Sequence, residues 1–444
     1  MTTTRSRRDG GLPRGLLLLM SAATGLAVSG NYFAQPLLDL IDRELGLGPT
    51  LAALTVTAAQ AGYALGLILL VPLGDLVERR RLAVSLYAAT AVFLLVSAAA
   101  PGGTVLLAGT ALTALTSVGA QVVVPFAAAL ADPAERGRVV GTVMTGLMLG
   151  LLLARTASGV LSELGGWRTV YWVNAVLMAL MAVLLRVFLP RLGGDGAGNG
   201  DGGNGADGGN SADSGDSGRL SYPGLLRSTA AMFRHEPLLR LRAAVCALSL
   251  ASFSVLWTAL TFLLVRPPYG WSESAIGLVG LAGVAGALTA TVAGRLADRG
   301  HVQTVTGAGT VLLLASWPAI AAGAHSPVWL LAGVIVLDLA HQAVLNGSQN
   351  VLYALRPEAR NRINSAFMTS LFLGGAAGSA LTPVAWVNGG WTGVCVLGGV
   401  LSAGTVVLWV LERVTAGRAT GGSPKARRHQ GGDPAPTPTT VKGE

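Results

Sequence analysis

Charged side chains are scarce in this sequence of 444 residues. They make up 12% of it, whereas a soluble domain carries roughly 25%. Hydrophobic residues make up 52%, and the mean hydropathy is +0.58. A soluble protein with so little charge would need an oversized core. The composition therefore indicates a chain that lies in a lipid bilayer.

Cysteine, histidine and nucleotide-binding motifs are also lacking. The two cysteines, Cys246 and Cys395, lie inside apolar runs without nearby partner ligands, so we expect neither a disulfide nor a metal site. The five histidines are scattered. No Gly-x-x-x-x-Gly-Lys-Ser/Thr loop is present, which excludes an ATP-driven motor. We expect a protein that is not an enzyme and that holds no cofactor.

Basic residues outnumber acidic ones, and the isoelectric point is near 10.2. The positive charge lies in the loops between apolar runs rather than on one soluble face, so we expect no nucleic-acid partner. The first apolar run is too long for a signal-peptide core and no cleavage site follows it, so we expect the N-terminus to stay attached.

Twelve apolar runs are long enough to cross a membrane as helices of about 20 residues. They are roughly 15–38, 51–73, 82–100, 104–130, 139–162, 169–190, 243–265, 275–296, 303–323, 327–354, 364–387 and 392–411.

These runs divide the chain into two six-helix bundles. The predicted segments are a cytoplasmic N-terminal segment 1–14, a bundle 15–190, a cytoplasmic linker 191–242, a bundle 243–411 and a disordered cytoplasmic tail 412–444. Within the linker, 193–218 consists almost wholly of Gly, Asn, Asp, Ser and Ala, which predicts disorder. Residues 222–242 have the pattern of an interfacial amphipathic helix.

The two bundles are repeats of one another. Segments 106–109, 132–136 and 165–167 match 330–333, 356–360 and 389–391, each at an offset of 224 residues. Several matches at one offset indicate a duplicated unit, as in many transporters.

The arginines predict the orientation. With the N-terminus inside, only Arg43, Arg168 and Arg266 of the 31 Lys and Arg residues fall outside, and Arg155 lies within a helix. By the positive-inside rule both termini are cytoplasmic.

Two apolar runs end in charged turns. The first holds Asp75, Arg79 and Arg80, and the second holds Gly294, Asp298 and Arg299. Two six-helix halves, a long central loop and these turns resemble the major facilitator superfamily over about residues 15–411. Segment 31–38 resembles the sugar-efflux-like and drug-efflux-like permeases of bacteria.

The family pattern for this turn is Gly-x-x-x-Asp-Arg-x-Gly-Arg-Arg, and the first turn departs from it at three positions. Val71 stands in place of the first glycine, Leu76 in place of the arginine after the aspartate, and Glu78 in place of the second glycine. The family's usual arginine in helix four and the Gly-Pro signature of drug–proton antiporters in helix five are also absent.

The resemblance implies that the charged turns form a conformational latch. Asp75 would accept hydrogen bonds from a helix N-terminus, and Arg79 and Arg80 would pair with acids across the interface between the halves. The alternative is that these arginines serve only the topology rule.

Three ionisable residues lie inside predicted membrane helices: Arg155, Asp338 and His341. Each costs about 2.5–3.5 kcal/mol at mid-membrane, which makes function the default hypothesis. Asp338 would accept a proton, tuned by His341 one turn further on and by Arg155. The alternatives are substrate binding without proton transfer and a buried ion pair that fixes packing.

The resemblance also implies a central cavity lined by helices one, four, seven and ten. Polar or aromatic residues of those helices are the candidate substrate-binding set: Asn31, Tyr32, Gln35, Thr113, Ser117, Gln121, Trp257, Thr261, Gln342 and Asn346. Such a lining suits a neutral or weakly cationic organic solute. The alternative is that the hydroxyl groups hydrogen-bond within membrane helices.

Small residues recur at four-residue spacing in helices two, five, eight and eleven. The pairs are Gly62/Gly66, Gly146/Gly150, Gly286/Ala290 and Gly374/Gly378. Their positions predict smooth surfaces for sliding between the halves.

The prediction as a whole is an all-α membrane protein of twelve helices, a secondary active transporter that works by alternating access. We expect proton-coupled efflux of a small organic solute. The alternatives are an uncoupled facilitator or importer, a non-transporting sensor and a membrane-embedded enzyme. The expected partners are a small-molecule substrate, protons and the lipid bilayer, and the expected form is a monomer in the inner (cytoplasmic) membrane.

Overall fold

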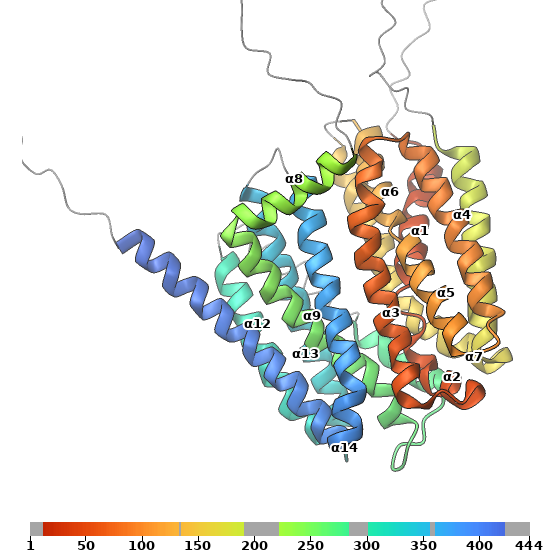
Figure 1. Ribbon diagram of the computed structural model, residues 1–444, viewed down its shortest axis with the longest axis vertical. Helices are drawn as coiled ribbons and strands as arrows, with labels where there is room; N and C mark the ends of the chain where they lie inside the picture. The colour runs from red at the N-terminus through yellow and green to blue at the C-terminus, as the bar shows by residue number, and fades with distance from the viewer. Residues whose placement is uncertain (1–11, 133–134, 191–221, 284–300, 356–359, 422–444) are drawn as a thin grey trace, which may run out of the picture.

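The computed structural model describes residues 12–132, 135–190, 222–283, 301–355 and 360–421, and these residues form helices joined by turns. Figure 1 shows two bundles side by side, α1–α7 in red to yellow and α9–α14 in green to blue. The helix α8 lies across one end, here called the α8 end. The opposite end, which carries α2, is the α2 end (Figure 1).

The first bundle contains α1 (Arg14–Ser29), η1 (Gln35–Leu37), α2 (Leu38–Leu45), α3 (Gly48–Leu69), η2 (Val71–Asp75), α4 (Arg79–Ala98), α5 (Gly103–Thr116), α6 (Gly119–Leu130) and α7 (Arg136–Phe188). The second contains α9 (Pro237–Leu264), α10 (Glu273–Val279), η3 (Gly280–Ala282), α12 (Val302–Ala322), α13 (Pro327–Leu355) and α14 (Arg360–Gly421). Between them lies α8 (Tyr222–His235).

Eight helices of the described residues are long and apolar enough to cross a membrane, with α5 and α6 counted together. Two of them, α7 and α14, are two crossings joined at a glycine kink. Gly166 has φ 77° and Gly390 has φ 55°, a conformation that favours glycine. These kinks separate the crossings predicted from the sequence at 139–162, 169–190, 364–387 and 392–411. The predicted run 275–296 begins with α10 and then leaves the described residues.

Two predicted helices are interrupted. The run 15–38 ends as a regular helix at Ser29 and continues in turns to η1, and the run 104–130 breaks at Ser117 and Val118. The two breaks meet, since a Cβ on Gly30 would lie 3.0 Å from Oγ of Ser117. Both predicted runs are therefore present but interrupted, and Gly103–Leu130 as a whole is still long and apolar enough to cross a membrane.

The small-residue pairs pack inside each half. A Cβ on Gly150 would lie 2.2 Å from the carbonyl oxygen of Gly25, and one on Gly374 would lie 2.2 Å from that of Ala247. Likewise, a Cβ on Gly62 would lie 2.2 Å from the carbonyl oxygen of Ala111. The prediction that these pairs form sliding surfaces between the halves was wrong. The pair 286/290 lies outside the described residues.

Each half has its own apolar core. One core surrounds Trp167 and Tyr171, and the other surrounds Leu256 and Trp317. A third, small cluster joins Leu38 of the first half to Phe262 of the second at the α2 end. The halves are thus separate packing units that meet along an interface, here called the seam.

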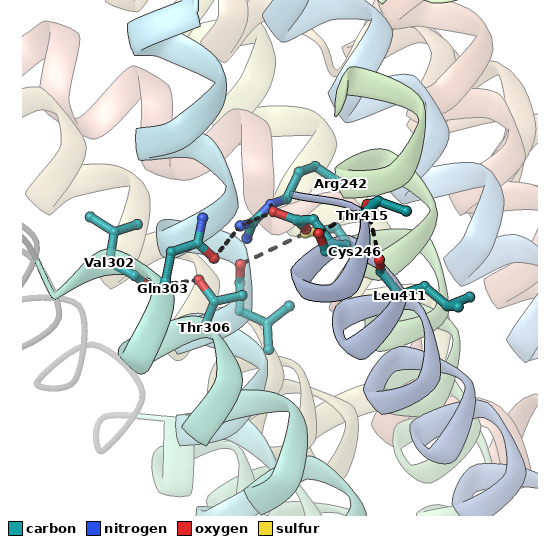
Figure 2. A network of polar contacts seen from close by, with 9 residues as sticks. Arg242, Cys246, Val302, Gln303, Thr306, Leu411 and Thr415 are labelled. Atoms are coloured by element: carbon teal, nitrogen blue, oxygen red, sulfur yellow. Dashed lines mark hydrogen bonds and ion pairs between the residues drawn. The ribbon is translucent and has the colours of Figure 1, made fainter. Parts of the chain in front are cut away.

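The second bundle extends beyond its predicted bounds. Helix α9 begins at Pro237 instead of 243, and α14 continues to Gly421 instead of ending at 411. Arg242, predicted to lie in the linker, is fully buried and donates to Oε1 of Glu412, predicted to lie in the tail, at 2.6 and 3.0 Å (Figure 2). It also donates to Gln303 at 2.7 Å. This buried pair joins the parts of α9 and α14 that lie beyond the predicted apolar runs.

Candidate functional site

Arg155 lies on α7 at the seam, with 2% of its surface exposed. Two glycines of the other half permit this close approach. A Cβ on Gly280 would lie 2.9 Å from the Cβ of Arg155, and one on Gly277 would lie 2.7 Å from its carbonyl oxygen. Nε donates a hydrogen bond to Oε1 of Gln35 at 2.7 Å. Within the described residues, Nη2 is buried without a partner.

Aromatic rings surround this guanidinium. Its Cζ lies 3.8 Å from the ring centroid of Trp257, 5.0 Å from that of Tyr32 and 5.7 Å from that of Phe253. A cation over an aromatic face is attracted by the ring quadrupole, most strongly where water is excluded. Because Phe253 and Trp257 belong to α9, the second half supplies most of this surrounding for a residue of the first half.

Asp338 lies on α13 and is 4% exposed. One of its oxygens accepts a hydrogen bond from Nε1 of Trp257 at 3.3 Å. In the part of the chain that the structure describes, no ion pair within 4.0 Å involves Asp338. The direct pair with Arg155 considered from the sequence is not formed. Trp257 contacts both residues instead, with its ring face on Arg155 and its indole N–H on Asp338.

His341 lies one turn beyond Asp338 on α13 and is also buried. Its Nδ1 lies 2.9 Å from Oγ of Ser249, and its ring centroid lies 4.9 Å from that of Phe253. No hydrogen bond between His341 and Asp338 occurs in the described structure. The histidine therefore adjoins the aromatic surrounding of Arg155 through Phe253 rather than through the acid.

Further polar contacts cross the seam beside this cluster. Thr261 of α9 donates to the carbonyl oxygen of Gln35 at 2.9 Å. Gln60 of α3 donates to Oγ of Ser254 at 3.0 Å, and Thr57 donates to Oγ of Ser379 at 3.1 Å. Sequence reasoning missed Gln60, Ser254 and Ser379. The amide of Gln60 inside an apolar run was the signal that could have found the first.

The structure brings four of the ten candidate substrate-binding residues together at Arg155. Tyr32, Gln35, Trp257 and Thr261 contact Arg155 or one another there. A fifth candidate, Gln121, lies near Tyr63, which packs against Phe372 of the other half.

The other five candidates make no hydrogen bond or ring contact with that cluster among the described residues. Ser117 donates to the carbonyl oxygen of Thr113 at 2.7 Å, the helix-internal bond that was the alternative for such residues. The amide of Asn31 and the hydroxyl of Thr113 are buried and unpartnered among the described residues. Gln342 and Asn346 are half-buried on α13.

Only part of the predicted latch can be located. Gly294, Asp298 and Arg299 lie outside the described residues. Asp75 ends η2, but its side chain is not described, and Arg79 begins α4. Arg80 donates to the carbonyl oxygen of Arg186, within the first half, instead of pairing with an acid across the seam.

Charged contacts join the halves at the α2 end. Nη2 of Arg43 on α2 lies 3.0 Å from Oε1 of Glu273 on α10. The backbone N–H of Ser274 donates to Glu163 at 3.3 Å, between the two crossings of α7. Hydrogen bonds from Ser274 and Ser272 hold the pKa of Glu163 below its ordinary value of 4.5. We call these two contacts the α2-end gate. Sequence reasoning assigned Arg43 a role in topology alone.

Comparison with known proteins adds a family to this geometry. A model of the Major Facilitator Superfamily matches residues 18–265 and 242–440. The transporter YgaY of Escherichia coli O157:H7 is 48% identical over 398 residues, which cover 90% of this chain and 95% of that one.

A more distant relative is a chloramphenicol resistance protein of Streptomyces lividans, 29% identical over 73% of this chain and 77% of its own. Among solved structures, a mutant of the peptide transporter POT in complex with alafosfalin aligns with a TM-score of 0.70. Its sequence identity is 16%, and the alignment covers 91% of this chain and 95% of that one.

Proposed function

Because the chain belongs to the Major Facilitator Superfamily and is a secondary transporter rather than an enzyme, we propose that it exports a small organic solute in exchange for protons. In this proposal Asp338 is the proton acceptor. His341 and Arg155 adjust its environment, and the halves rock about the seam to expose the site to each side in turn.

The observation that carries the proposal is the buried carboxylate of Asp338, which no cation of the described residues contacts. A buried charge without a paired opposite charge is costly, and taking up a proton removes that cost. A static ion pair would instead hold both charges permanently. A single hydrogen bond from Trp257 leaves the carboxylate free to bind a proton or a donor group of the cargo in turn.

We assign the α8 end to the cytoplasm, so that both termini are cytoplasmic. In this proposal the protein spans the cytoplasmic membrane and acts as a monomer. The excess of Lys and Arg on that side supports the assignment. The α2 end is then external. On this assignment, the contacts of the α2-end gate and of Leu38 with Phe262 support a state that is closed toward the outside.

The charged turns would act at the opposite end. Asp75, Arg79 and Arg80 of the first turn, with Gly294, Asp298 and Arg299 of the second, form the proposed cytoplasmic latch. A coupling of about 1–3 kcal/mol is typical of such a device and is enough to bias two nearly equal states.

The cargo site proposed is the cluster of Tyr32, Gln35, Trp257 and Thr261 around Arg155, with the remaining predicted residues, Asn31, Thr113, Ser117, Gln121, Gln342 and Asn346, lining the approach. The name of the Streptomyces lividans relative supports chloramphenicol as the first compound to test. The efflux-like segment 31–38, which contains two of the cluster residues, supports export.

The test uses everted membrane vesicles enriched in the protein and energised by respiration, with a pH-sensitive dye in the lumen. Chloramphenicol, cationic dyes, other antibiotics and sugars are added singly. We expect at least one compound to release protons from the lumen in the wild type. We expect the Asp338→Asn variant to lose this release, and the Asp42→Asn variant, which makes the same change at a half-buried position of α2, to keep it.

Two outcomes would contradict the proposal. Proton release that survives Asp338→Asn would move coupling to another group, with His341→Gln the next variant. Uptake of a labelled compound without proton release would leave an uncoupled facilitator.

A further inference from the structure

The described structure contains two deeply buried arginines, and they differ in how their charge is matched. Arg242 is fully buried and lies 2.6 Å from the carboxylate of Glu412. Arg155 is 2% exposed, and among the described residues its one hydrogen-bond partner is a neutral amide and no carboxylate lies within 4.0 Å. Each has a buried terminal nitrogen without a partner among the described residues, but of the two only Arg155 lacks an anion in contact there.

The guanidinium of Arg155 is held in a fixed orientation despite this. Nε is bonded to Gln35, and the face of Trp257 lies 3.8 Å from Cζ. These two contacts restrain both the position and the plane of the group, so the direction of Nη2 is set before any ligand arrives. A donor oriented in advance binds an acceptor without first losing side-chain freedom.

A buried charged donor left without an acceptor is destabilising, and a structural role does not require it. A neutral side chain of similar length would fill the same space between Trp257 and Tyr32. The arrangement has a clear use if the acceptor arrives from outside the chain. The location at the seam, between α7 of one half and α9 and α10 of the other, means that rocking would uncover it.

We propose that Arg155 binds the cargo directly, through a hydrogen bond from Nη2 to a planar oxygen acceptor such as a carboxylate, nitro or carboxamide group. The aromatic surfaces of Trp257 and Phe253 favour an aryl ring next to that group. A donor group elsewhere on the cargo would reach Asp338, which Trp257 separates from Arg155, and would compete there with the proton. This last step rests on the proposed antiport, whereas binding at Arg155 does not.

The test measures ligand binding to the purified full-length protein by isothermal titration calorimetry. The probes are matched aromatic pairs: 4-nitrobenzyl alcohol, 4-carboxybenzyl alcohol and 4-carbamoylbenzyl alcohol, each against benzyl alcohol, together with chloramphenicol against its analogue with hydrogen in place of the nitro group. We expect at least one oxygen-bearing member to bind about ten- to a hundredfold more tightly than its partner.

The Arg155→Met variant should lose that preference, and Arg155→Lys should retain only part of it, since the charge remains but the planar fork is lost. Arg266→Met is the matched control. It removes an exposed arginine whose Cζ lies 5.3 Å from the ring of Trp386, and it should leave the preference unchanged. Size-exclusion profiles establish that the variants are folded.

Equal affinity within every probe pair in the wild type would overturn the inference, whatever the variants do. A preference that persists in Arg155→Met would also overturn it. Failure of the proposed antiport can be distinguished from failure of binding at Arg155. The Asp338→Asn variant should keep the oxygen preference in binding but lose proton release from vesicles. Oxygen preference without any proton release in the wild type would sustain Arg155 as the binding residue and reject antiport.

Discussion

The two buried acid and arginine clusters of this protein show opposite solutions to the same problem. At the α8 end of the second bundle, Arg242 and Glu412 are in direct contact, with Gln303 as a further partner (Figure 2). At the seam, Arg155 and Asp338 both contact Trp257 but not one another. A contacting pair within one bundle holds helices together. Opposite charges kept apart at an interface remain able to bind a proton and a ligand.

The largest expected effect comes from breaking the contacting pair. The Glu412→Gln variant leaves the charge of Arg242 buried without an anion, which should lower stability by about 3–5 kcal/mol. The measurement is the thermal unfolding of the purified protein. Replacing both residues, as in Arg242→Met with Glu412→Met, should restore most of the loss, because a buried pair is replaceable by apolar packing. A double variant as unstable as the single one would contradict this interpretation.

Removing the acid at the seam should change activity rather than stability. Asp338→Asn keeps the size of the side chain and leaves no contacting cation of the described residues unpaired, so we expect a stability change within about 1 kcal/mol. Proton release in vesicles should fall at least tenfold. A loss of stability as large as that of Glu412→Gln would mean that the two clusters are alike, and the contrast between them would fail.

Trp257→Phe should give a smaller effect that acts on both charges at once. It removes the N–H donor to Asp338 and weakens the aromatic contact with Arg155, each worth about 0.5–2 kcal/mol. We expect weaker cargo binding and a shifted pH dependence of transport, measured in the vesicle assay. Phe253→Leu provides the comparison, since it removes the more distant ring, which also contacts His341, but keeps the hydrogen bond to Asp338. Equal effects of the two variants would contradict the interpretation that Trp257 acts on both Arg155 and Asp338.

The smallest expected effect concerns the α2-end gate, which is exposed. Arg43→Gln should shift the balance between closed and open states by no more than about 1 kcal/mol, and high salt should reduce the shift. The measurement is the distance between spin labels at positions 42 and 268. Since the pKa of Glu163 is lowered in the closed state, its contact is present above pH 4.5 and is lost as the pH falls below that value. Spin-label distances that change neither with salt concentration nor with acid would show that the α2-end gate does not stabilise the closed state.

Glycine substitutions sharpen the contrast between the seam and the bundle interiors. Gly150→Ala places a Cβ 2.2 Å from a backbone oxygen of the same half and should lower stability by about 1–3 kcal/mol. Gly277→Ala places one 2.7 Å from the carbonyl oxygen of Arg155 in the other half, so it should favour the state open at the α2 end. Thermal unfolding and the same spin-label distances separate these outcomes. A similar loss of stability in both variants would mean that Gly277 packs as Gly150 does, and the contrast between the seam and the bundle interior would not hold.

Much of the fold could be predicted because the bilayer acts on each helix separately. A crossing must be about 20 apolar residues long, so the runs and the turns at Gly166 and Gly390 were visible in the sequence. The breaks after Ser29 and at Ser117 were not, since they arise where two helices meet. The ends of α9 and α14 were misplaced for the same reason. The charges of Arg242 and Glu412 reduce hydropathy, and only their pairing across 170 residues makes them part of the membrane bundle.

For the candidate site, the sequence predicted which residues take part but not how they contact one another. Arg155, Asp338 and His341 stood out because ionisable groups in apolar runs are rare. The sequence alone was enough to predict the apolar runs and the polar residues within them, because each run depends on local hydropathy, and the repeat of the two halves followed from matching segments. The tertiary structure alone decided that Trp257 lies between Arg155 and Asp338 while Arg242 meets Glu412 directly. Such contacts depend on how helices distant in sequence are rotated and packed, and hydropathy carries no information about that.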